Sequence, residues 1–388
     1  MENFGKATIA GLLGDSLIFR SLQPVDPRLP GLAAVRGSLG IPPAVTPRKI
    51  QPQYGRVVGE ILGSAQALLH PGQGLDRLLY IGDTPGSDGS AFRNIARAVG
   101  CPGALFIGSE QPDPEDPQVT RDDDFLYIKS QTWRDTYYLE EICQQHGLVI
   151  DDSCAVVIDL DKTVIGARGR NDAVINRARV DAVQKTVAEV LGDDFSADVF
   201  ERDYRIINQN RYHPFTQDNQ DYVAYVCLLL GSGAISREQL IEELSGEKQI
   251  TFAAFLRQVD ALKDHLTPAL ADLHQRFFEA YRSGDPTPFK AFRRQEYLET
   301  MTRFGTLPDS AAAVDFLSEE IVLTAEVYRT AQMWKERGLL LFGLSDKPDE
   351  ASLPTEEQAK KGWHPIHRAE THLIGHAEGE SGNHWRNL

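Results

Sequence analysis

The sequence predicts an α/β protein with a parallel, Rossmann-like sheet that is interrupted by an all-helical insert. Residues 77–108 read as a strand, a helix and a strand in succession, and such alternation favours a parallel sheet. Further apolar runs of strand type occur at 154–160 and 338–348, and the stretch between them carries helical periodicity with glycine stops. Because strands flank the helical stretch on both sides, we expect an insertion within the α/β unit.

The elements are expected in a definite order along the chain. Residues 21–53 are proline-rich and irregular, and the first strand–helix–strand unit follows as RLLYIGD (77–83), SAFRNIARAVG (90–100) and GALFIG (103–108). EQPDPEDPQVTRDDD (110–124) holds three prolines and seven acids, which predicts an exposed loop. A strand at 123–130, a helix at 133–147 and strands at CAVVIDL (154–160) and GLLLFGLSDKP (338–348) complete the pattern. We place the boundaries at 1–167 and 336–388 for the α/β unit and at 168–335 for the insert.

Length and composition restrict the class of protein. The 388 residues fit one large domain or two moderate ones. No apolar run approaches the length of a membrane span, and Gly11, Gly14 and Asp15 interrupt the start of the chain where a secretory signal would be apolar. We therefore expect no membrane partner and a cytoplasmic location.

Charge and cysteine usage narrow the partners further. The formal net charge of -16 argues against nucleic acid as a partner. A small anionic substrate remains compatible with it, because a local arginine cluster or a divalent cation overrides the overall field. The four cysteines are scattered without metal-ligand spacing, so we expect reduced, buried thiols.

Polar residues follow three of the expected strands, in VVIDLDKT, LLLFGLSDKP and LLYIGDTPGSDG. Ligands of open parallel sheets bind beyond the carboxyl ends of the strands. Asp159 can act as a nucleophile toward phosphorus, and Asp161 can give and take the proton. Two carboxylates facing a phosphate would repel it, so a divalent cation is needed, and Asp83 and Asp88 offer oxygen ligands suited to Mg²⁺.

Ser345 and a lysine would complete the charge balance around the phosphoryl group. Each motif alone is also typical of a solvated strand end, a turn or a helix cap. The three together, each ending an apolar strand, favour a catalytic site.

These motifs resemble those of the haloacid dehalogenase-like phosphohydrolase superfamily. Its first motif, DxDx(T/V) after an apolar strand, is similar to Asp159, Asp161 and Thr163; its second matches Ser345, and its fourth matches Asp83 and Asp88. SDKP resembles the TNKP of phosphoglycolate phosphatase-like members. The third motif is a lysine before a helix. PRKIQPQYGRVVGEILG (47–63) makes Lys49 the best candidate, with Arg48 and Lys347 as rivals.

The order of the motifs departs from the family, because the third and fourth precede the first and second. This resembles a circular permutation that joins the usual ends near residues 147–153 and opens new ends between the second and third motifs. Permutation is tolerated when the original termini lie close together at the surface.

The resemblance implies specific roles for these residues. Asp159 would be the nucleophile, Asp161 the acid and base, and Ser345 and Lys49 the phosphate contacts. Mg²⁺ would be held by Asp159, the Asp161 carbonyl, and Asp83 or Asp88. Dehalogenase members have no acid/base at the position of Asp161, so this residue favours phosphoryl transfer.

The expected activity is that of a magnesium-dependent phosphatase that hydrolyses a small phosphorylated metabolite through an aspartyl-phosphate. A phosphomutase or phosphotransferase of the same fold, or a non-catalytic binding protein, are the alternatives. The sequence does not indicate an oligomeric state.

The resemblance also gives the helical insert a role as a cap domain, which favours a small soluble substrate. In GARGRND, Arg168 and Arg170 lie near the cap entrance, where they either grip a second anionic group or are surface arginines of a hinge. The C-terminal stretch contains His364, His367, His372, His376 and His384. Their spacing matches no zinc pattern, so we expect no metal there.

Overall fold

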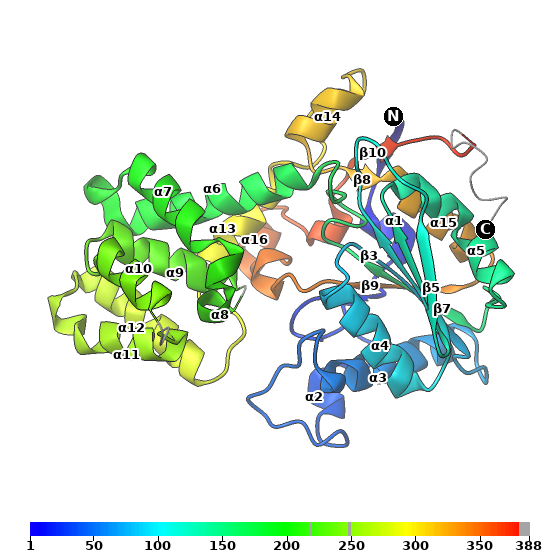
Figure 1. Cartoon of the computed structure of the whole chain (residues 1–388), viewed down its shortest axis with the longest axis horizontal. Helices are drawn as coiled ribbons and strands as arrows, with labels where there is room; N and C mark the ends of the chain where they lie inside the picture. The colour runs from blue at the N-terminus through cyan, green and yellow to red at the C-terminus, as the bar shows by residue number, and fades with distance from the viewer. Residues whose placement is uncertain (218, 247–249, 380–388) are drawn as a thin grey trace. The chain divides into compact units, whose positions relative to one another are not determined.

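The computed structural model describes residues 1–217, 219–246 and 250–379. The chain forms two compact units, one of Met1–Arg177 with Thr300–Leu388 and one of Ala178–Glu299. The second unit is shorter at both ends than the predicted insert 168–335. Residues 300–335 belong to the first unit because their strand and helices pack with its sheets (Figure 1).

The first unit is built on a seven-stranded sheet in the order β2-β9-β7-β3-β4-β6-β5. All neighbouring strands are parallel except β5 and β6. The strands are β2 (Leu17–Ile18), β9 (Leu340–Leu344), β7 (Cys154–Asp159), β3 (Arg77–Gly82), β4 (Gly103–Gly108), β6 (Phe125–Ser130) and β5 (Gln118–Asp122). The prediction of a mixed α/β fold with a mostly parallel sheet is confirmed.

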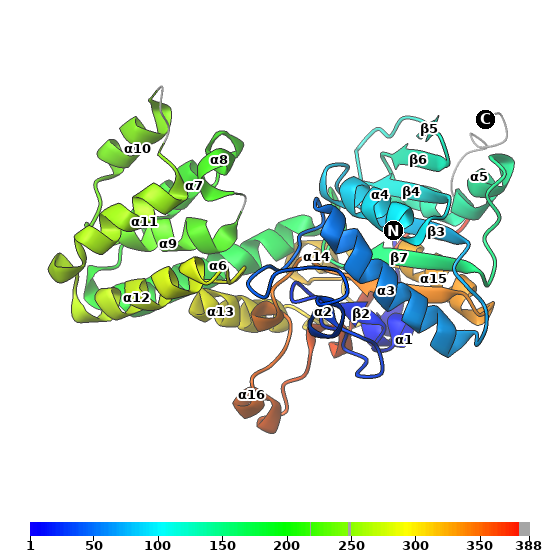
Figure 2. The same ribbon diagram turned by 90° about the horizontal axis from the view of Figure 1, so that it is seen from below.

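Helices cover both faces of this sheet. The helices α3 (Pro52–Leu69) and α4 (Ser87–Val99) pack together and share a core with alternate residues of β3, β7 and β9. The helix α15 (Ala325–Glu336) contacts β9 and lies on the other side of the strands (Figure 2). Every residue of β4, β7 and β9 is buried, which explains why these strands read as continuous apolar runs.

A second sheet joins the two ends of the described chain. The strand β1 (Glu2–Ala7) pairs antiparallel with β10 (Thr371–Gly375), and β10 pairs parallel with β8 (Leu323–Thr324). Glu2 is the partner of Gly375. The sequence patterns did not predict this three-stranded sheet.

Two further segments differ from their predictions. The predicted loop 110–124 is wrong over 118–122, where β5 forms an exposed antiparallel edge strand whose charged side chains suit an edge. The helix predicted at 133–147 is a 3₁₀ helix, Trp133–Tyr138, followed by α5 (Leu139–Gln145).

The remaining short helices of the first unit are α1 (Ile9–Leu13), α2 (Leu32–Val35), α14 (Ala313–Glu319) and α16 (Glu356–Lys360). Within 1–217, 219–246 and 250–379, no helix is long and apolar enough to cross a membrane.

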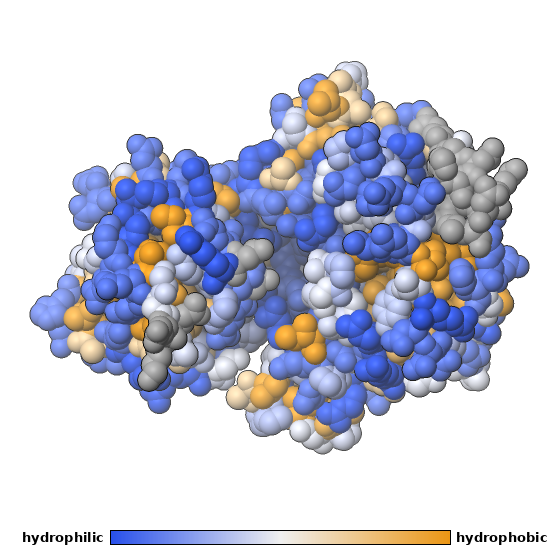
Figure 3. Space-filling view, viewed as in Figure 1, coloured by the Kyte–Doolittle hydropathy of each residue, from blue (hydrophilic) through white to orange (hydrophobic). Residues whose placement is uncertain are grey.

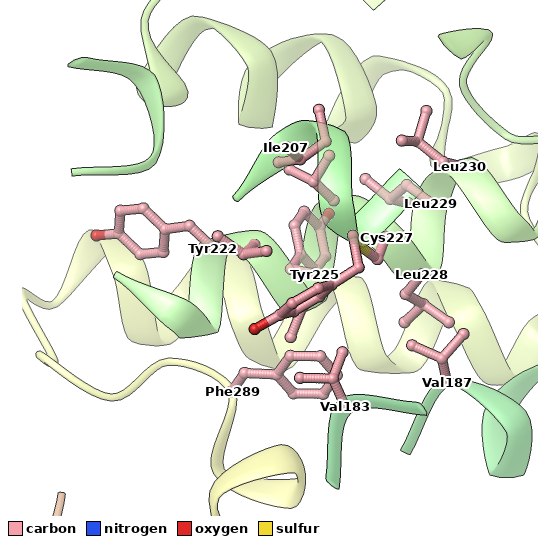
Figure 4. Packing of buried hydrophobic residues seen from close by; sticks show 14 of the residues in the cluster. Val183, Val187, Ile207, Tyr222, Tyr225, Cys227, Leu228, Leu229, Leu230 and Phe289 are labelled. Atoms are coloured by element: carbon pink, nitrogen blue, oxygen red, sulfur yellow. The ribbon is translucent and has the colours of Figure 1, made fainter. Parts of the chain in front are cut away.

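The second unit is entirely helical in its described part. Its helices are the later part of α6 (Asp172–Leu191), then α7 (Ala197–Ile207), α8 (His213–Thr216), α9 (Gln220–Gly231), α10 (Arg237–Ser245), α11 (Phe252–Ala261), α12 (Pro268–Arg282) and most of α13 (Lys290–Met301). Polar side chains cover much of the face of this unit seen in Figure 3. Its core surrounds α9, which is buried from Asp221 to Leu230 (Figure 4).

Aromatic stacking and a buried ion pair hold this helical core together. Tyr222 stacks on Phe252 with ring centroids 3.9 Å apart, and Tyr225 stacks on Phe277 at 4.0 Å. Arg293 donates from Nη2 to the Asp221 carboxylate at 2.6 Å, and both side chains are almost fully buried.

Candidate metal and phosphate site

The three polar motifs lie at the carboxyl ends of three adjacent strands. The central strand β7 ends at Asp159, Asp83 directly follows β3, and Ser345 directly follows β9. The register pairs Ile81 with Ile158, and Asp159 with Leu344. The three strand ends are therefore level, and the side chains that follow them meet at one edge of the sheet.

Three carboxylates form a compact cluster at this edge. Asp83, Asp88 and Asp159 each offer an oxygen atom within 4.8 Å of the others, and all three side chains are buried. Asp88 lies in the first turn of α4 and accepts hydrogen bonds from the amides of Asp83, at 3.1 Å, and Thr84, at 2.9 Å. A Cβ at Gly82 would lie 2.7 Å from the Asp88 carboxylate, so glycine permits this close approach.

Lys49 is the buried cation of the cluster. Its Nζ donates to Asp159 Oδ1 at 2.6 Å and to Asp88 Oδ1 at 2.7 Å, and only 3% of the residue is exposed. The Asn94 side chain of α4 donates to the Lys49 carbonyl at 3.0 Å and so fixes the chain before α3. Of the three basic residues considered for this position, Lys49 is the one that contacts Asp159.

The other two basic candidates lie next to neighbouring acids. Lys347 Nζ is 3.8 Å from Asp161 Oδ1, and Arg48 Nη2 is 3.7 Å from Asp346 Oδ2. Both belong to the same edge of the sheet, but neither is paired with the carboxylate cluster in these contacts.

Burial and mutual repulsion set the protonation of the cluster. Burial raises the pKa of Asp159 well above its usual range, and the charges of Asp88 and Asp83 add to this against the opposing Lys49 ammonium. Burial and Asp88 likewise raise the pKa of Asp83. Burial acts in the same direction on Asp88, but Lys49 and the two backbone amides outweigh it and lower the pKa of Asp88.

The lysine responds in the opposite sense. Burial alone would lower the pKa of Lys49, but the charges of Asp159 and Asp88 outweigh it and raise this pKa well above its usual value. The Lys49 ammonium thus pairs with two of the three carboxylates, and the Arg168 guanidinium pairs with the third, Asp83. Three carboxylates still outnumber two single positive charges, and a divalent cation would relieve the remaining repulsion.

Asp161 lies on the Ser345 side of Asp159. Ser345 Oγ donates to Asp161 Oδ2 at 2.8 Å and accepts from the backbone amide of Lys347 at 2.9 Å. Among the described residues, the buried Asp161 Oδ1 has no hydrogen-bond partner. The Asp161 carboxylate is therefore held by the hydrogen bond from Ser345 and by the longer ion pair with Lys347, and it is not a member of the three-carboxylate cluster.

The chain turns sharply after Asp161. Lys162 adopts a φ of 63°, in the left-handed region. The turn brings the fully buried Thr163 back toward β7, where its Oγ1 lies 3.5 Å from Asp159 Oδ2. The structure thus places Thr163 against the predicted nucleophile.

Arg168 contacts the outer side of the cluster. Its Nε donates to Asp83 Oδ2 at 2.6 Å, its Nη2 donates to Thr84 Oγ1 at 3.3 Å, and 40% of its side chain is exposed. Arg168 is thus a half-exposed cation beside the candidate metal ligands.

Arg170 is neither of the two things the sequence suggested, because it is not a surface arginine and its guanidinium is paired with two glutamates and not available to a substrate. Its side chain is 1% exposed and pairs with Glu326 and Glu110, each at 2.8 Å. Gly169 lies against Glu110, where a Cβ would be 2.2 Å from the carbonyl oxygen. These contacts tie the loop 168–171 to α15 and to the segment after β4.

Sequence patterns missed two residues of the site. The buried Tyr80 donates from Oη to Asp88 Oδ1 at 3.1 Å, but in the sequence it reads as one residue of an apolar strand. Thr84 donates from its hydroxyl to Asp83 Oδ1 at 3.0 Å. Its place directly after Asp83 was the only signal for it.

The described C-terminal histidines lie apart from the cluster. His372 lies between Glu320, at 2.8 Å, and Asp309, at 3.1 Å, and His367 lies 3.2 Å from Asp15. His384 is outside the described residues. Within the part of the chain that is described, the three aspartates are the one group with the geometry of a metal site.

Comparison of the chain with models of protein families, with curated proteins and with solved structures gave no match. The chemistry of the site is therefore argued from its geometry.

Proposed function

We propose that the protein is a magnesium-dependent phosphatase of the haloacid dehalogenase-like type, which hydrolyses a small phosphorylated metabolite through an aspartyl-phosphate on Asp159. One observation carries the proposal: at the level ends of three parallel strands, Asp159 belongs to a carboxylate cluster that includes a lysine partner, and Ser345 at the neighbouring strand end holds Asp161. The proposal assigns a nucleophile, a cation site and a proton carrier to these residues.

The donor set fits a hard divalent cation. Asp83, Asp88 and Asp159 offer carboxylate oxygens without any sulfur or imidazole ligand, which is the chemistry that Mg²⁺ prefers. The Asp161 carbonyl is a further oxygen ligand in this proposal. Bound there, Mg²⁺ would neutralise charge on the phosphoryl oxygens and offset the repulsion among the aspartates.

The residues of the chain then have complementary tasks. A carboxylate oxygen of Asp159 attacks phosphorus, while the Lys49 ammonium and the Ser345 hydroxyl stabilise negative charge on the phosphoryl oxygens. Asp161 donates a proton to the leaving oxygen as the ester P–O bond breaks. It then takes a proton from the water that attacks phosphorus, which releases inorganic phosphate and regenerates Asp159.

The topology supports a circular permutation. If the chain is read from β7, it runs from the centre of the sheet to β9 and on to the C-terminal segment. It then resumes at the N-terminal segment with β2, and continues to β3 and β4 on the other side of β7. That is the winding of an ordinary doubly wound sheet. The pairing of Glu2 with Gly375 supports the position of the new ends.

The helical unit Ala178–Glu299 is proposed as the cap. It lies in the chain between Asp161 and Ser345, and it has its own buried core. A cap of this kind would exclude water and select small substrates.

The test is phosphate release from para-nitrophenyl phosphate and from a panel of sugar, polyol and amino-acid phosphates. We expect turnover with Mg²⁺, none after chelation, and a loss of at least about a thousandfold in Asp159→Asn. The exposed Asp113 provides the control Asp113→Asn, which should keep full activity. Full activity of Asp159→Asn on the best substrate would refute the mechanism.

A further inference from the structure

Two arginines meet the loop that carries Ser345. Arg20 follows β2 and donates from Nε to the Asp346 carbonyl at 2.8 Å. Arg48 precedes Lys49, and its Nη2 lies 3.7 Å from Asp346 Oδ2. The guanidinium of Arg48 is therefore beside the strand end that supplies Ser345, next in sequence to the lysine of the cluster.

The side chain of Arg48 is incompletely used by the protein. A guanidinium carries five N–H donors, yet across the described ranges the Arg48 side chain makes no hydrogen bond, and its Nε is buried without a partner. Its ion pair with Asp346 is longer than a hydrogen bond, and the two side chains are 38% and 33% exposed. Such a pair is well screened by water and weak.

An arginine in this state is suited to a ligand. Burying a donor without an acceptor is unfavourable, and an acceptor from a bound molecule would remove that cost. Guanidinium groups bind carboxylate and phosphate in a planar, two-pronged geometry that lysine lacks. The location is also suitable, because Arg48 directly precedes Lys49 in the chain and its ion pair reaches Asp346, the residue after Ser345.

We propose that Arg48 binds a second anionic group of the substrate. This inference rests on the proposed function and specifies it: the substrate is a phosphomonoester that carries a second anionic group, either a carboxylate or another phosphate. Lys49 and Ser345 contact the reacting phosphate, and Arg48 contacts the second anion. Asp346 is the intramolecular partner that the anion displaces.

Matched pairs of substrates test this proposal. O-phosphoserine differs from phosphoethanolamine by one carboxylate, and fructose 1,6-bisphosphate differs from fructose 6-phosphate by one phosphate. The first pair tests the carboxylate source of the anion and the second pair the phosphate source.

Each pair is assayed with Mg²⁺ on the wild type and on Arg48→Met, Arg48→Lys and Arg56→Met. Arg56 is the control because it is exposed on α3 and, among the described residues, its side chain makes no hydrogen bond or ion pair.

In at least one of the two pairs, we expect the wild type to prefer the substrate that carries the extra anion. The preference should appear mainly as a lower KM for that substrate. Arg48→Met should remove this preference by about 10- to 100-fold in kcat/KM, Arg48→Lys should restore only part of it, and Arg56→Met should leave it unchanged. Arg56→Met should keep the wild-type rate with para-nitrophenyl phosphate, which has no second anion.

Two outcomes separate this inference from the proposed function. If para-nitrophenyl phosphate is hydrolysed but neither pair shows a preference, or the preference survives in Arg48→Met, the inference about Arg48 is overturned and the phosphatase stands. If no ester is hydrolysed, the proposed function fails. The anion site is then tested by the equilibrium dissociation constants of the same pairs. The inference about Arg48 is refuted if the two members of each pair bind equally well, or if Arg48→Met does not change the difference between them.

Discussion

Replacement of Lys49 by methionine tests whether one ammonium balances the acidic cluster. The Nζ atom makes two charged hydrogen bonds, of 2.6 and 2.7 Å, to Asp159 and Asp88, and all three side chains are less than a tenth exposed. Removal of one partner of a buried ion pair costs about 3–5 kcal/mol. We expect Lys49→Met to lose about that much free energy of unfolding when measured by urea denaturation in a chelator.

A second substitution distinguishes charge imbalance from lost packing. Asp159→Asn in the Lys49→Met background removes one of the stranded carboxylates, so we expect it to recover more than half of the loss. Mg²⁺ should also stabilise Lys49→Met more than the wild type, because the divalent ion replaces the missing charge. A loss below about 1 kcal/mol, or no recovery in the double variant, would refute this account of the cluster.

Three further perturbations follow from the structure. Asp161→Asn should lower kcat by about 10²–10⁴-fold in steady-state assays, and an unchanged kcat would contradict its role as acid and base. Burial raises the pKa of Asp135 from 3.8 to about 7, so the folded state keeps a proton that the unfolded state has lost. Stability should therefore fall by about 4 kcal/mol between about pH 4 and pH 7 and stay level above it. Asp135→Asn should flatten this part of the pH profile of urea denaturation, and an unchanged slope would count against it. Arg170→Met should cost about 3–5 kcal/mol in the same assay, because it leaves Glu326 and Glu110 without their cation. A cost below about 1 kcal/mol would show that these pairs contribute little.

The central strands and the acidic residues after them could be predicted because both have a local signature. The strands β7 and β9 are buried along their whole length, so they read as apolar runs that stop where the chain meets the polar edge of the sheet. Asp83 and Asp159 follow or end such runs, and the spacing from Asp83 to Asp88 fits a turn into a helix. The position of each strand end and of the acidic residue beside it can therefore be predicted from a few consecutive residues.

Contacts between distant segments could not be predicted from local patterns. From its sequence context, Arg170 could be an anion-binding residue or a surface arginine of a hinge, but it is a buried ion-pair partner of Glu110 and Glu326, which lie 60 and 156 residues away. The choice of Lys49 over Arg48 depends on the path of an irregular segment before α3. The position of Lys49 is fixed by a hydrogen bond from the Asn94 side chain of α4 to the Lys49 carbonyl. The periodicity of apolar residues gives no information about such a contact.

The compact helical unit Ala178–Glu299 is shorter than the predicted insert for a related reason. Residues 300–335 have helical spacing like the insert, but α15 contacts the β-sheet strand β9 and belongs to the first unit. Periodicity identifies a helix and its apolar face, but it does not identify the surface on which that face packs. The strand β10 was missed because its partner β1 is at the opposite end of the sequence.

The pairing of β1 with β10 has a mechanical consequence. Glu2 and Gly375 lie side by side in an antiparallel pair, and the hydrogen bonds of such a pair run across the strands. A force that pulls these two residues apart would load the bonds one after another and not all at once. In single-molecule pulling we expect the small sheet to open at low force when the handles are at residues 2 and 375. A handle moved from residue 375 to residue 371 would load several bonds together and should raise that force.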